Sequence, residues 1–408
     1  MRLALLSVLL LAVACSSDKP PRTGQPDAGG TEDSGTGGDD AGTVEDGGTE
    51  PDGGSGPDGG AEPADSGTDG DAGTGGDGGT SDAGTADGGS CEAPAAERGA
   101  ELATRLNTPR RLAVDATDLY ISESHTLNPQ QPQPGPGQVL RLSRSGGEPT
   151  PLATGFRAPD AIAVDATSVY VLDLDGLWRV DKATGRRGDQ PIDATVSNVT
   201  VGGTEVLRAT LSGRDVLVVA TGQRWLVRVD TDGNNRQELY AGTGAAQVRG
   251  ARVVGTDVWF LVNAGTAAGN SSGLYRVPLD GSAPAERTDA TILQGNSLEV
   301  TPTHFLITEG GGGTGRVLRL PRGGGTAEVL AEGLQGPWFP VELNGAVYFK
   351  EARAGSADFL RRVRACAPGT SDPVGPLGTG PGGLLVDGST LLYTSQESGS
   401  GGTVGRVP

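Results

Sequence analysis

Short apolar runs, rich in β-branched and aromatic residues, alternate with polar and glycine-rich turns from about residue 98 to the end of the chain, and they recur with a period. The clearest repeat is an apolar run with an Arg followed by Val or Leu. Its seven copies are Val139–Leu142, Leu177–Val180, Leu226–Val229, Leu274–Val277, Val317–Leu320, Leu360–Val363 and Val404–Val407. Their arginines lie 38 to 49 residues apart. Such a period, in strand-like runs, predicts a seven-bladed β-propeller.

Each predicted blade begins with a first strand that contains one apolar marker position. The markers are Val114, Val164, Leu211, Val253, Val300, Val341 and Val386. A polar turn and a second alternating run follow each marker, then a loop, the Arg-containing third strand and a fourth strand. Alternation of this kind is typical of half-buried strands, and no stretch has the length and periodicity of a helix. We therefore expect an all-β fold.

The seventh repeat ends after its third strand, so its fourth strand must come from elsewhere. Residues 98–106, leading into Pro109, parallel residues 147–155, leading into Pro159. Nearly the same sequence, Leu/Ile-Ala-Val-Asp-Ala-Thr, follows each of them. We expect the N-terminal segment to close the ring as a fourth strand, because closure removes the exposed edges of an open sheet.

The first residues have the features of an export signal. Arg2 is followed by the apolar run Leu3–Val13, which is too short to span a bilayer, and small residues lead to Cys15. This pattern resembles the lipobox of bacterial lipoproteins, which implies cleavage before Cys15 and lipidation of that residue. By resemblance to Gram-negative sorting, Ser16 implies the outer membrane, with the protein facing the periplasm or the surface. Ordinary secretion is the alternative.

Residues 16–90 form a low-complexity segment of Asp, Gly, Thr, Ala and Ser. They contain 18 Asp and Glu against 2 Lys and Arg, and so carry most of the chain's net charge of −19. Such a composition cannot bury enough apolar surface to order itself, so we expect a disordered tether that spans roughly 50 Å. It resembles the spacers of myxobacterial lipoproteins. The acidity therefore belongs to the tether and does not indicate a basic ligand for the expected propeller domain, residues 91–408.

The repeat resembles the bacterial propellers of the YWTD, NHL and TolB-like group. The closest local match is residues 228–236, which are similar to the third-strand-to-turn signature of YWTD blades. This resemblance covers residues 98–408 and implies a six- or seven-bladed scaffold. Its motifs are structural, and they name no activity.

Cys91 and Cys366 are the remaining cysteines. They fall on neighbouring blades near the ring closure, and disulfides persist in exported proteins, so we expect a disulfide between them. Two free thiols are the alternative. With one such pair, and with His125 and His304 as the only histidines, the sequence does not provide a zinc site.

Candidate chemistry at the axis is sparse. Glu123, Asp173 and Glu309 lie nine residues after their markers, but the other blades have no acid at that position. This is a scattered acidic rim rather than a ring of ligands, so we predict no catalytic residue, no metal and no cofactor. The alternative is a hydrolase or lyase at the axis, which would resemble lactonase-type propellers.

Loops at one end of the axis are the best candidates for binding, because binding residues concentrate on loops over rigid scaffolds. The residues four positions before the markers form a ring of Arg110, Asp160, Leu207, Arg249, Asn296, Pro337 and Gly382. The candidate ligand-binding residues are Arg110, Asp160, Arg249, Asn296, Trp338, Glu123, His125 and Glu309. This mixture suits a small polar ligand or a protein; nucleic acid would require a basic surface. The alternative for Trp338 is a plug of the axial channel. We therefore expect a lipid-anchored envelope propeller that acts as a binding or scaffolding module.

Overall fold

The computed structural model describes residues 99–125, 136–196, 203–265, 271–364, 367–378, 382–396 and 401–407. In these ranges the chain is all-β, as predicted, and no segment forms a helix that could cross a membrane. The predictions for the signal segment, Cys15, the tether, Cys91 and Cys366 concern residues outside these ranges.

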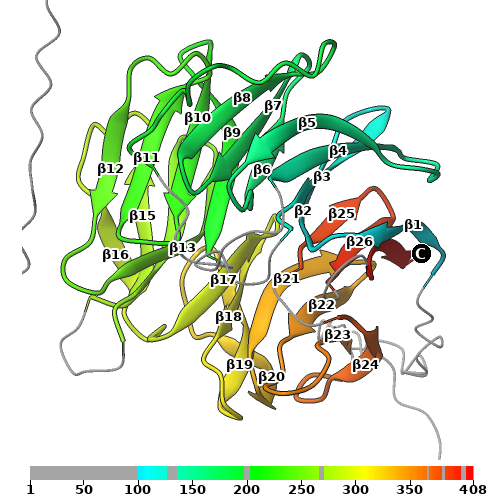
Figure 1. The fold of residues 1–408 in the computed structure, drawn as a ribbon. Helices are drawn as coiled ribbons and strands as arrows, with labels where there is room; N and C mark the ends of the chain where they lie inside the picture. The colour runs from blue at the N-terminus through cyan, green and yellow to red at the C-terminus, as the bar shows by residue number, and fades with distance from the viewer. Residues whose placement is uncertain are drawn as a thin grey trace, which may run out of the picture. The chain divides into compact units, whose positions relative to one another are not determined.

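Seven antiparallel sheets are arranged in a ring, which confirms the predicted number of blades (Figure 1). Blade 1 contains β2 (Pro109–Val114), β3 (Asp118–Glu123), β4 (Gly137–Ser143) and β5 (Thr150–Phe156). Blade 2 contains β6 (Ile162–Val164), β7 (Ser168–Asp173) and β8 (Gly176–Asp181). Blade 3 contains β9 (Thr204–Leu211), β10 (Arg214–Thr221), β11 (Trp225–Asp230) and β12 (Gln237–Ala241).

The remaining blades follow in chain order. Blade 4 contains β13 (Gln247–Val254), β14 (Asp257–Asn263), β15 (Gly273–Pro278) and β16 (Glu286–Asp289). Blade 5 contains β17 (Gly295–Val300), β18 (His304–Glu309), β19 (Gly315–Pro321) and β20 (Glu328–Leu334). Blade 6 contains β21 (Pro337–Leu343), β22 (Ala346–Glu351), β23 (Phe359–Arg364) and β24 (Asp372–Pro376). Blade 7 contains β25 (Leu384–Asp387), β26 (Thr390–Ser395), β27 (Gly402–Val407) and β1 (Glu101–Leu106).

The N-terminal strand closes the ring, as the sequence predicts. β1 pairs antiparallel with β27, with Ala103 opposite Val404 and Leu106 opposite Gly402. In Figure 1, β1 lies beside the C-terminal end of the chain. The closing sheet therefore combines strands from the two ends of the propeller.

Blade 2 departs from the predicted four strands. Its sheet contains three strands, and only isolated bridges, Leu177 to Asp193 and Val180 to Arg187, connect β8 to the segment that follows. That segment contains Gly185, Gly188 and Pro191 and lacks alternating apolar residues. Glycine and proline disfavour a regular strand, which explains why the fourth strand does not form.

In blades 1 and 3 the repeated arginine of the third strand links neighbouring blades, whereas Arg276 and Arg319 pair with glutamates of their own blades. The Arg228 guanidinium donates to the carbonyl of Leu279 at 3.0 Å, and Arg141 donates to the carbonyl of Lys182. Leu279 and Lys182 each follow the third strand of the next blade directly. The most regular motif of the sequence is therefore structural, and the function must be sought at other positions.

Candidate functional site

The innermost strands of several blades bulge at the same end of the axis. In the pairing of β2 with β3, Pro109 lies opposite Glu123 and Leu112 lies opposite Ile121. Two arginines, 110 and 111, therefore face a single serine. The same irregularity occurs in β13, at residues 250–251, and in β21, at residues 339–340. Bulges re-aim side chains, so the residues at this end of the strands depart from regular alternation.

Strand pairing corrects two members of the predicted ring. In blades 3 and 6 the predicted marker does not lie opposite the start of the second apolar run. Val216 lies opposite Ala209 and not the marker Leu211, and Val347 lies opposite Glu342 and not the marker Val341. The residues four positions earlier are therefore Glu205 and Trp338, in place of Leu207 and Pro337. With this correction Trp338 takes the same position in its blade as Arg249 takes in blade 4. We call this end of the axis the axial mouth, formed by Arg110, Arg111, Asp160, Arg249, Asn296 and Trp338.

One part of the axial mouth is a buried cluster of charges. The Arg111 Nε lies 3.7 Å from Asp160 Oδ1, and the Lys350 Nζ lies 2.9 Å from Asp358 Oδ2. Burial lowers the pKa of Lys350 to about 8, the ion pair with Asp358 opposes this shift, and the charges of Arg110 and Arg111 lower it further. Arg110 is 2% exposed and Lys350 is 1% exposed, so this cluster forms the buried part of the axial mouth.

The other part of the axial mouth is partly exposed and surrounds Arg249. Its guanidinium donates to Asn296 Oδ1 at 3.3 Å and to Gln247 Oε1 at 2.6 Å, and it lies 5.2 Å from the centre of the Trp338 ring. The amide of Asn296 in turn donates to the carbonyl of Pro337 at 3.2 Å. Side chains from blades 4, 5 and 6 are thus fixed against one another.

A series of guanidinium and ring contacts connects blades 1, 6 and 4. The Arg111 guanidinium lies 4.1 Å from the centre of the Phe339 ring, and the rings of Phe339 and Trp338 lie 5.9 Å apart. The Arg249 guanidinium lies over the Trp338 ring. Phe339 is buried and has a φ of 53°, which is uncommon for a residue other than glycine. Phe339 is thus the buried member of this aromatic pair, and Trp338 is the partly exposed one.

The acidic rim holds the loops that enter the innermost strands. Asp173 accepts a hydrogen bond from the backbone N–H of Arg157 at 2.9 Å, and Glu351 accepts one from the backbone N–H of Gln335 at 3.1 Å. Glu123 accepts one from the backbone N–H of residue 107. Each donor stands two residues before the proline that precedes or begins an innermost strand. These carboxylates therefore shape the entrance from outside the axial mouth.

The other predicted rim residues are also engaged. His125 Nε2 lies 3.0 Å from Glu123 Oε2, which also accepts a hydrogen bond from Gln138. Glu309 is ion-paired with Arg316. The structure thus places Glu123, His125 and Glu309 in an outer ring of loop contacts, whereas it brings Arg249, Asn296 and Trp338 together.

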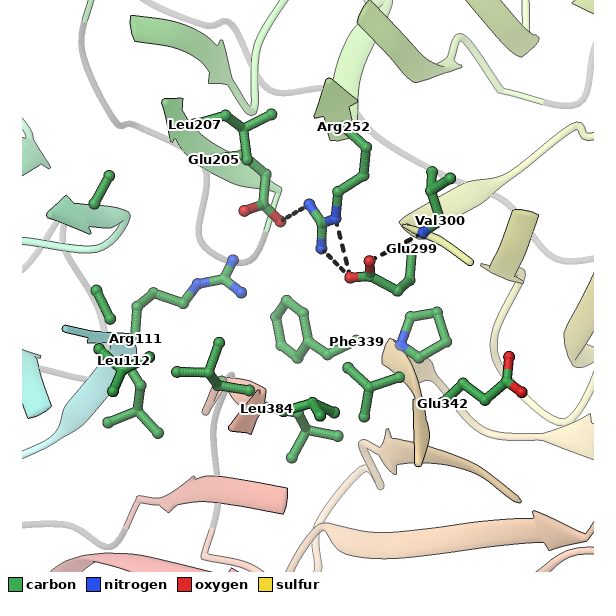
Figure 2. Close-up of a pocket in the computed structure, with 18 of the residues that line it drawn as sticks. Arg111, Leu112, Glu205, Leu207, Arg252, Glu299, Val300, Phe339, Glu342 and Leu384 are labelled. Carbon is green, nitrogen blue, oxygen red and sulfur yellow. Dashed lines mark hydrogen bonds and ion pairs between the residues drawn. The ribbon is translucent and has the colours of Figure 1, made fainter. Parts of the chain in front are cut away.

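A cavity of about 1110 Å³ runs along the innermost strands, and Figure 2 shows it in close-up. It extends from Arg111 and Phe339 to the turns after the first strands, at residues 301–303 and at Asn344. Its walls are mostly apolar, with Leu112, Ile162, Val206, Val300, Val341 and Leu384 among them. None of the eight predicted binding residues lines it.

One charged network crosses the wall of this cavity, and the sequence reasoning missed it. Arg252 lies 3.4 Å from Glu205 and 2.9 Å from Glu299 (Figure 2). Burial alone would lower the pKa of Arg252, but the two carboxylates outweigh it and raise the pKa. Arg252 and Glu299 both stand directly before the marker of their blade, and opposite charges at this shared position in neighbouring blades were the available signal.

In the part of the chain that the structure describes, no three His, Cys, Asp or Glu side chains are grouped so that they could hold a metal ion.

Comparison with known proteins identifies similar solved structures only. No protein-family profile matches the chain, and no curated protein matches it. BamB from Moraxella catarrhalis is 14% identical, with a TM-score of 0.44, over 73% of this chain and 85% of that one. A chain of the nidogen/laminin complex is 15% identical, with a TM-score of 0.41, over 58% of this chain and 90% of that one. The assignment as a propeller rests on the strand pairing described above.

Proposed function

We propose that the protein is a lipid-anchored protein of the bacterial envelope whose propeller binds a protein or a small polar ligand at the axial mouth. One observation carries this proposal: Arg249 and Trp338 are partly exposed, come from different blades, and are stacked on each other at 5.2 Å. Arginine and tryptophan are the residues that most often dominate recognition energy.

The surrounding contacts favour binding because they fix these side chains in advance. Asn296 holds Arg249 from blade 5, and Phe339 packs against Trp338 from within blade 6. A side chain that is already ordered loses little conformational entropy when a ligand arrives. Glu123, His125 and Glu309 complete the proposed site as an outer ring that positions the loops.

The binding role is tested by chemical crosslinking of the full chain in native envelope. Replacing Trp338 with Ala should lower the yield of the crosslinked partner by at least about tenfold. Trp225 provides a matched control, since it is also partly exposed and stacked under an arginine, Arg224, at 4.6 Å. Trp225→Ala and deletion of residues 16–90 should leave the yield unchanged. If deletion of the tether abolishes crosslinking while the Trp338→Ala variant is crosslinked as well as the wild type, binding belongs to the acidic segment instead.

The anchor is supported by the lipobox at Cys15 and by the tether that follows it. A Cys15→Ser variant should move from the membrane fraction to the soluble exported fraction, because acyl chains stabilise attachment by roughly 0.8 kcal/mol per buried methylene. Unchanged fractionation, together with an N-terminal peptide that carries no acyl mass, would refute the anchor.

A further inference from the structure

Arg249 differs from the other arginines of the axis in the charge of its contacts. Arg252 is paired with two glutamates, and Arg111 lies beside Asp160. Arg249 contacts two neutral amide oxygens, of Asn296 and Gln247, and the face of one indole. Among the described residues it forms no ion pair.

This arrangement leaves the guanidinium with positive charge that its surroundings do not neutralise. Burial lowers the pKa of Arg249, and its Nε is buried with no acceptor among the described residues. A largely desolvated charge without an opposite charge is costly to the fold. Natural proteins accept such costs mainly at sites where the group has a functional role.

The position of Arg249 makes it accessible to a ligand. Its side chain and that of Trp338 are both partly exposed at the axial mouth. The guanidinium has five N–H groups, of which two donate to Asn296 and Gln247, so donors remain for a further acceptor. Its plane is held between these amides and the indole, which fixes the direction from which an acceptor must approach.

We infer that Arg249 is the binding site for a carboxylate, with Trp338 forming the wall against which the apolar part of the ligand packs. This inference deepens the proposed function and rests on it for the location of the ligand at the axial mouth. The planar guanidinium matches a carboxylate in shape and in charge. A doubly charged phosphate would call for a second available cation, but Arg111 and Lys350 already lie beside Asp160 and Asp358.

The carboxylate could belong to a free small molecule or to the C-terminus or an acidic side chain of a partner. The full chain is titrated with benzoate, benzylamine and inorganic phosphate, followed by calorimetry and tryptophan fluorescence. Benzoate should bind, and Arg249→Met should weaken it at least about tenfold. Arg224→Met is the matched control, because Arg224 is exposed and stacks on Trp225, and it should leave binding unchanged. Binding of phosphate or benzylamine in place of benzoate, or equal benzoate binding by the Arg249 variant, overturns the inference.

Thermal unfolding separates this role from a structural one. Without ligand, Arg249→Met should unfold at the same temperature as the wild type or higher, since it removes an uncompensated charge. Benzoate should raise the unfolding temperature of the wild type and not that of the variant. A variant that is clearly less stable without ligand would make Arg249 structural and overturn the inference.

Two further measurements identify the source of the carboxylate and keep the two proposals apart. A dipeptide ending in phenylalanine with a free carboxylate is compared with its amide and with benzoate. Tighter binding of the free peptide assigns the site to a partner's C-terminus, and tighter binding of benzoate assigns it to a small molecule; both support the carboxylate site. If crosslinking to a partner depends on Trp338 while no carboxylate binds, the proposed function stands and this inference falls.

Discussion

The Arg111 guanidinium lies 4.1 Å from the centre of the Phe339 ring and joins the innermost strands of blades 1 and 6 across the axis. Both side chains are buried, and both come from strand bulges. Both residues also line the cavity along the innermost strands, so this contact lies where the axial mouth and the cavity meet.

Replacing Phe339 with Ala should therefore destabilise the propeller. The change removes a buried ring and its contact with Arg111, and we expect a loss of about 3 kcal/mol in the free energy of unfolding. Urea denaturation measures it. Leu293, which is 44% exposed, provides the control, and Leu293→Ala should change stability by less than about 0.5 kcal/mol. Equal effects of the two substitutions would show that the Phe339 ring does not stabilise the fold.

Arg252 should be required for stability because it neutralises two carboxylates. An Arg252→Leu variant leaves Glu205 and Glu299 facing each other in a largely apolar wall. We expect a loss of about 2 kcal/mol, which is less than for a fully buried broken pair because the groups keep some exposure. Adding Glu205→Gln and Glu299→Gln should recover most of the loss. A triple variant as unstable as the single one would show that the arginine acts through packing alone.

Two tyrosines should set the alkaline limit of the fold. The hydroxyl of Tyr120 donates to Asp115 at 2.9 Å and that of Tyr170 to Asp165 at 2.7 Å. Burial, together with these hydrogen bonds to a carboxylate, raises the pKa of each tyrosine to about 12. Their stabilisation is fully present below the unfolded value near 10 and is lost as the pH rises toward 12.

Tyrosinate absorbance in an alkaline titration measures this shift. In an Asp115→Asn variant, Tyr120 should titrate at lower pH and the propeller should unfold at lower pH than the wild type. If the variant and the wild type give the same titration curve, the hydrogen bond does not control the tyrosine.

Because β1 closes the ring, N-terminal truncations that keep β1 should be more stable than those that remove it. With reductant present, so that no bond from Cys91 contributes, a chain that begins at residue 99 keeps β1 and should unfold cooperatively at the temperature of the full chain. A chain that begins at residue 108 lacks β1 and exposes the edge of β27, so it should unfold at lower temperature and self-associate. Calorimetry and gel filtration measure both effects, and equal behaviour of the two truncations would contradict the closure.

Cys91 and Cys366 should form a disulfide in the exported protein. Cys91 precedes β1, and Cys366 follows β23 in the neighbouring blade. A crosslink over so long a loop could stabilise by about 4 kcal/mol in the chain-entropy picture. Peptide mapping without reductant should recover the two cysteines in one linked peptide. Recovery of both as free thiols would rule out the bond.

The blade number and the closing strand could be predicted because both follow from strand periodicity. The parallel between residues 98–106 and 147–155 was sufficient to identify β1. The missing fourth strand of blade 2 was not predicted. The repeat arginine, Arg179, is present in this blade, but the residues after its third strand do not pair regularly. The recurrence of the third strand along the chain does not predict whether a fourth strand follows it.

The site was predicted less completely because bulges and register are set by packing between blades. Counting from Leu211 selected Leu207, whereas pairing with β10 selects Glu205. Phe339 and Arg111 were missed because each lies one residue beyond a predicted position, in a bulge that no local sequence pattern marks. Arg249 contacts both Asn296 and Trp338, three residues that the sequence placed among its binding candidates, and their role in binding stays a prediction.

The pairing of β1 with β27 also has a consequence for the order of events during biosynthesis. β1 leaves the ribosome first among the strands of the propeller, and its partner leaves last. The seventh sheet can form only when residues 402–407 have been made, so the ring stays open throughout translation. For the envelope protein that we propose, this delay favours export, because the contact that completes the tertiary structure is the last one available to the chain.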